Sequence, residues 1–68
     1  MILSPEEAVQ ILEAGGDHAL LRAVKSCIEL GKTPTGIRRH LEHLYPPNST
    51  VLMLVEQAAK FYQAEKED

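Results

Sequence analysis

The feature that most constrains this chain is the regular spacing of residues that begin and end helices. Ser4-Pro5 precedes the first apolar segment, and Gly15-Gly16 follows it. A serine accepts a hydrogen bond from an unpaired amide at a helix start, proline suits the first helical position, and glycine adopts the left-handed conformation at a helix end. Asp17 and Gly31 bracket a second segment in the same way. This pattern predicts short helices joined by tight turns.

The second half of the chain carries the same signals. Thr33-Pro34, or Thr35, begins a third segment, and Pro46-Pro47 ends it because proline disfavours helical geometry in the residue before it. Asn48 or Ser49 then caps a fourth segment. No run shows the alternation typical of a strand. We therefore predict an all-α fold, a single compact bundle of four short helices at about 5–14, 18–30, 34–45 and 49–64, with residues 1–68 forming one domain.

Apolar residues recur at helical spacing in the second and third segments. The second segment carries one such face: Leu20, Leu21, Val24, Cys27 and Ile28. The third segment carries a stripe with the same property: Ile37, Leu41, Leu44 and Tyr45. Because residues three and four apart lie on one side of a helix, we expect both faces to pack into the core.

The fourth segment has more apolar residues than one helix face holds. They cover more than half of the helix circumference: Val51, Leu52, Met53, Leu54, Val55, Ala58, Ala59, Phe61 and Tyr62. Two interpretations stay open. Either this is the central helix of the bundle, or part of its surface contacts another chain. For the second interpretation we predict a contact stripe of Leu52, Met53, Val55, Ala59 and Tyr62.

Charge is unevenly distributed along the chain, whose net charge is −3. Residues 1–16 carry three acidic residues and no basic one, whereas residues 17–45 carry five basic and three acidic residues. An acidic chain argues against nucleic acid as the default partner, because phosphate binding relies on basic surface. The basic middle segment nevertheless keeps nucleic acid open as a less favoured partner.

The second and third segments resemble a helix-turn-helix motif across their turn. Cys27, Leu30, Gly31 and Ile37 match its pattern, whereas Lys32 and His40 stand where that motif usually carries apolar residues. The resemblance implies DNA binding through the helix at 34–45. The side chains that it places toward nucleic acid are Thr35, Arg38, Arg39 and His43. The alternative is an ordinary solvated face in which Arg38 pairs with Glu42, one helical turn away.

Zinc-binding residue types also occur in the middle of the chain. His40 and His43 are three residues apart, Cys27 precedes them, and His18 is the one remaining histidine. Cys27 falls on an apolar helix face, however, where a lone cysteine usually behaves as a small hydrophobic residue. The sequence has no glycine-rich phosphate loop. We therefore predict no metal, no cofactor and no enzymatic activity.

The leading functional hypothesis is a small, non-catalytic protein–protein interaction module. Such a module acts as an adaptor, inhibitor or accessory subunit through an apolar helical surface. Because a domain of 68 residues has a small core, we also expect self-association into a homo-oligomer such as a homodimer. The alternative is a helix-turn-helix-like DNA-binding regulator that uses residues 34–45. The first residues do not resemble a signal peptide, and the longest apolar run, Val51–Val55, is too short for a membrane span. The expected location is therefore cytoplasmic, without membrane binding.

Overall fold

Four helices and no strands make up the regular structure of residues 3–67, the part of the chain that the computed structural model describes. The helices are α1 (Pro5–Ala14), α2 (His18–Glu29), α3 (Pro34–Leu41) and α4 (Thr50–Glu67). The predicted all-α fold with four packed helices is confirmed. Two boundaries differ from the prediction by more than one residue: α3 ends at residue 41 instead of 45, and α4 continues to residue 67 instead of 64.

The helix starts are capped by the predicted hydroxyl residues. Ser4, Thr33 and Ser49 each accept a hydrogen bond from a backbone amide in the first turn of the following helix, at 3.2, 3.0 and 3.3 Å. Asp17 stands at the predicted cap position of α2, but its side chain accepts no capping hydrogen bond. Local sequence therefore places all four helix starts, while the hydrogen bond expected of Asp17 does not form.

Two glycines end α1 and α2 in the left-handed conformation. Gly16 and Gly31 have φ angles of 81° and 97°, which strain any residue with a Cβ atom. The residue after each glycine donates its amide back to a carbonyl of the preceding helix, at 2.9 Å in both cases. This is the Schellman arrangement, and it satisfies carbonyl groups that the helix end leaves unpaired.

The end of α3 is tightened before the proline pair. The amides of Leu44 and Tyr45 both donate to the carbonyl oxygen of Leu41, at 2.8 and 3.0 Å. Leu44 follows Leu41 by three residues, which is the hydrogen-bond spacing of a 3₁₀ turn. Pro46 in turn disfavours helical geometry in Tyr45. The change in winding moves Leu44 away from the core, and its side chain is 70% exposed. The prediction that Leu44 belongs to a buried stripe is therefore wrong.

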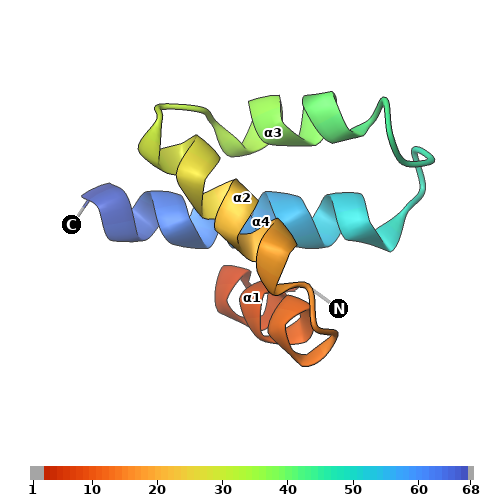
Figure 1. The fold of residues 1–68 in the computed structure, drawn as a ribbon, viewed down its shortest axis with the longest axis horizontal. Coiled ribbons are helices and arrows are strands. Elements are labelled where there is room, and N and C mark those ends of the chain that lie inside the picture. Colours follow the sequence, from red (N-terminus) through yellow and green to blue (C-terminus); the bar gives the residue numbers. More distant parts are fainter. Residues whose placement is uncertain (1–2, 68) are drawn as a thin grey trace.

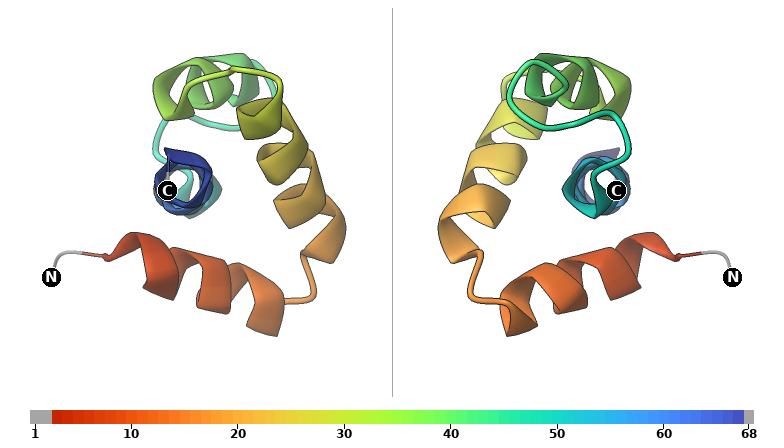
Figure 2. Two further views of the ribbon diagram at one scale, coloured as in Figure 1. Left: turned by 90° about the vertical axis from the view of Figure 1, so that its left-hand side faces the viewer. Right: turned by 90° about the vertical axis from the view of Figure 1, so that its right-hand side faces the viewer.

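α4 lies at the centre of the fold, with the other three helices on three of its sides (Figures 1 and 2). α3 runs alongside α4, α1 crosses α4 on the side opposite α3, and α2 joins the two outer helices (Figure 2). Most of the packing between helices involves α4, and α2 makes less contact with α1 and α3 than with α4. The apolar excess of the fourth segment therefore follows from its central position.

Two apolar clusters connect α4 to the outer helices. The first joins α1 and α2 to α4 through buried side chains: Ala8, Val9, Leu12, Leu21, Leu54 and Ala58. The second joins α2 and α3 to α4: Val24, Ile28, Ile37, Val55 and Ala59. No polar or charged residue is classed as buried between residues 3 and 67. The core therefore depends on apolar burial, and α4 contributes to both clusters.

The last turn of α4 packs against the end of α2. The Lys66 Nζ donates a hydrogen bond to the carbonyl oxygen of Ile28 at 3.0 Å. A cation also interacts favourably with the negative end of the α2 dipole. This contact connects segments that are 38 residues apart, so the extension of α4 beyond residue 64 depends on tertiary structure.

The central position of α4 predicts losses of stability of different size for two neighbouring residues. Leu52 is 1% exposed and Met53 is 46% exposed. We expect Leu52→Ala to lower the free energy of unfolding by about 3 kcal/mol, because it removes buried surface and leaves a cavity. Met53→Ala should cost less than about 1 kcal/mol, as is usual for surface positions. Urea denaturation followed by circular dichroism measures both, and equal losses would contradict the central position of α4.

Candidate functional site

The predicted contact stripe on the fourth helix is corrected by the structure. Leu52, Val55 and Ala59 are 1%, 0% and 0% exposed, so all three are enclosed by the same chain. A partner could reach them only if the bundle opened. Their spacing is that of a contact stripe, but Val55 and Ala59 make their contacts with α2 and α3.

The two remaining residues of that stripe have different surroundings. Met53 is exposed on α4, one side of which no other helix covers (Figure 2). Tyr62 is half-buried against both apolar clusters, and its ring meets that of Phe61 edge-on at 5.6 Å between centroids. Burial raises the pKa of Tyr62, and the carboxylates of Glu13 and Glu65 raise it further. The accessible part of the stripe is therefore reduced to Met53 and one edge of Tyr62.

The predicted nucleic-acid face is only partly available. Thr35, Arg39 and His43 are exposed, although His43 lies in the turn beyond the end of α3. Arg38 instead reaches toward α4, where its Nη1 donates to Glu56 Oε1 at 3.0 Å. Glu56, and not the predicted Glu42, is thus the partner of Arg38. DNA binding stays a prediction, and this ion pair removes one of its four proposed contacts from the outer face.

Two of the candidate metal ligands lie in the same region. Cys27 on α2 and His40 on α3 both line a surface groove, whereas His43 and His18 are not among its lining residues. Within residues 3–67 no three His, Cys, Asp or Glu side chains are grouped closely enough to hold a metal ion. The structure therefore brings together one pair of the predicted ligands and no complete set.

This groove lies between α2 and α3 and has a volume of about 580 Å³. It forms because α2 and α3 separate beyond the turn that joins them, while each packs on α4 (Figure 1). Small residues on the two walls keep it open, Ala23 on α2 and Gly36 on α3. Its lining is mainly apolar: Leu20, Ala23, Val24, Cys27, Lys32, Gly36, Ile37, His40 and Leu41.

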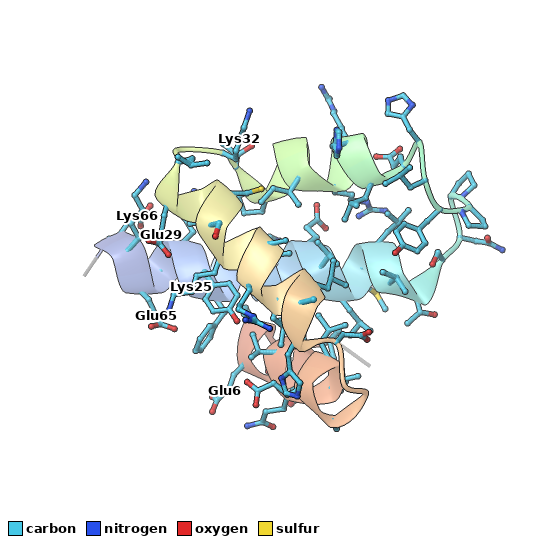
Figure 3. The ribbon with its side chains drawn as sticks, in the orientation of Figure 1. Glu6, Lys25, Glu29, Lys32, Glu65 and Lys66 are labelled. Carbon is cyan, nitrogen blue, oxygen red and sulfur yellow. The ribbon has the colours of Figure 1, made fainter. Side chains whose placement is uncertain are left out.

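The charged groups of the groove have one sign. Lys32 lies at the turn between α2 and α3, with its side chain directed away from α4 (Figure 3). Lys32 is the one residue of the described lining that is formally charged at pH 7, and no carboxylate lines the groove within residues 3–67. Arg39 is exposed on the neighbouring face of α3. The groove therefore combines an apolar floor with a basic rim.

A second face of α2, outside the apolar stripe predicted from the sequence, carries no charged residue. Four exposed, uncharged residues follow one another at helical spacing: Ala19, Ala23, Ser26 and Leu30. A solvated helix face normally carries charged residues. The sequence thus carries a second uncharged face on α2, and of its four residues Ala23 lines the groove.

No protein-family model matches this chain, and the comparisons with curated proteins and with solved structures gave no match. Over residues 3–67, none of the helices combines the length and the apolar character needed to cross a bilayer. The geometry of the groove and its charge are therefore the features from which a function can be inferred.

The ion pair between Arg38 and Glu56 predicts a specific coupling energy. The two side chains are 38% and 19% exposed, so solvent screens their attraction. We expect a double-mutant cycle with Arg38→Ala and Glu56→Ala to give a coupling of about 0.5 kcal/mol that decreases as salt is added. The matched cycle with Arg38→Ala and Glu42→Ala should give no coupling. If Arg38 showed coupling to Glu42 and none to Glu56, the ion pair with α4 would be contradicted and the surface pair predicted from the sequence would be supported.

Proposed function

We propose that this chain is a non-catalytic protein-interaction module that receives a helix of a partner protein in the groove between α2 and α3. One observation carries the proposal. The groove is apolar, and Leu20, Cys27 and Leu41 in its lining stay partly exposed although they pack against the second cluster. Apolar side chains that stay partly exposed along a concave surface are characteristic of a binding site.

The form of the groove supports a helical ligand. Its two walls are helices that diverge from a common turn, and between them lie the apolar side chains of Val24 and Ile37. An amphipathic helix binds such a groove by inserting apolar side chains spaced three or four residues apart. Leu30 and Leu44, which flank α3 in the sequence, are 81% and 70% exposed, although neither lines the groove.

The residue types in the groove favour binding over catalysis. Cys27 is half-buried on the helix face that also carries Val24, which supports a packing role for its thiol. Catalysis needs a site that excludes water around the reacting groups, whereas this groove lies along the surface between two helices. A module with one such groove fits the role of an adaptor, inhibitor or accessory subunit.

A selection experiment tests this proposal even though the partner protein is not identified. A library of helical peptides of about 15 residues, long enough to form a helix on binding, is displayed and selected on the purified protein. We expect peptides with an apolar stripe to be enriched. Their affinity should fall at least about tenfold for Ala23→Glu, which places a charge on the groove wall.

The matched control is Ala64→Glu, the same substitution at an exposed position of α4 that does not line the groove. It should leave peptide affinity unchanged. Circular dichroism should show that both variants stay folded, because both alanines are exposed. Failure to enrich any peptide that distinguishes Ala23→Glu from Ala64→Glu would overturn the proposed function.

A further inference from the structure

We infer that the groove binds α1 of a second copy of this chain, so that copies associate head to tail. This inference rests on the proposed function, because it names the helix that the groove receives. Both contact surfaces are present on the one chain. Their charges, their apolar residues and their positions in the fold each support the pairing.

The charges of the two surfaces are complementary. The charged side chains of α1 are all acidic, and all three carboxylates are exposed: Glu6, Glu7 and Glu13. The groove carries the positive charge of Lys32 without a carboxylate among its described lining residues, and Arg39 is exposed on the neighbouring face of α3. Opposite potentials favour encounter and fix the orientation of two surfaces. A pairing of two grooves with each other would instead bring like charges together.

α1 also presents an apolar edge to solvent. Ile11 is 48% exposed, and Ala14, one turn further along the helix, is exposed as well. Glu7 lies one turn before Ile11 on the same side of the helix and is exposed. This edge therefore has the composition expected of a ligand for an apolar groove with a basic rim. Ile11 is the side chain that would enter the groove.

The fold keeps the two surfaces apart within one molecule. α1 lies on the opposite side of α4 from α3 (Figure 2), and Glu6 and Lys32 are on opposite sides of the molecule (Figure 3). α1 thus cannot reach the groove of its own chain without unfolding. A contact between two different surfaces is heterologous, so it leaves one α1 and one groove free and allows further copies to add.

Sedimentation of the wild-type chain gives the first test. We expect the average mass to rise with protein concentration at low salt and to pass beyond that of a dimer. Because the contact surfaces are small, the association should be weak, and added salt should dissociate it. Ile11→Lys and Ala23→Glu should each weaken self-association at least about tenfold. The matched control is Ala64→Glu on α4, the same substitution as Ala23→Glu at an exposed position outside the groove. It should leave self-association unchanged.

Mixing the two variants gives the decisive measurement. Ile11→Lys retains an intact groove and Ala23→Glu retains an intact α1, so the mixture can form one correct contact per pair. We expect each variant alone to be monomeric and the mixture to form a 1:1 dimer that does not grow. A mixture that stays monomeric, or a wild-type chain that is monomeric at millimolar concentration and low salt, would falsify the inference.

The outcome is distinguishable from failure of the proposed function. If the wild-type chain stays monomeric while peptide selection still yields ligands that depend on Ala23, the groove binds another protein and only the second-copy inference fails. If the chain self-associates but the mixture does not form a dimer, the contact lies elsewhere and the inference also fails. Thermal unfolding of both variants checks that lost association does not reflect a lost fold.

Discussion

The apolar contact of α4 with all three other helices is the constraint on which the rest of the structure depends. A domain of this length buries only about 60% of its unfolded surface, so each helix needs an apolar partner close by. The outer helices contact one another less than they contact α4. Val55 and Ala58 show why one helix is sufficient, since both are fully buried and they belong to different clusters. The core therefore closes within a single chain, without the partner that a small domain often requires.

The number of helices and their starts were predictable from the sequence, because each start depends on contacts within three residues. Ser4 and Thr33 bond amides of their own first turn, and Gly31 ends α2 through its own backbone conformation. The position of Leu44 was not predictable by periodicity, because the proline pair tightens the helix end and changes its phase. The excess of apolar residues after Ser49 indicated several buried faces, but it could not distinguish neighbouring helices from another chain.

Less of the candidate site was predictable, since its contacts join distant parts of the chain. Periodicity offers Arg38 the carboxylate of Glu42, one turn away, whereas the fold supplies Glu56 from α4. In a similar way, neither Ala23 nor Gly36 by itself indicates a binding groove in the sequence. They become the walls of a groove only because α2 crosses α4 while α3 runs alongside it (Figure 1). Sequence identified the basic and apolar residues of this region, and tertiary structure decided which of them face solvent.

The groove and the core share residues, which couples binding to stability. Val24 and Ile37 lie in the groove lining and also belong to the cluster that holds α2 and α3 on α4. A side chain inserted from outside therefore adds apolar contacts to the same cluster that Val55 and Ala59 fill from the inside. Any ligand that binds only the folded state stabilises it in proportion to the logarithm of its concentration. An occupant of this groove would therefore act as a fifth packing element and would raise the free energy of unfolding.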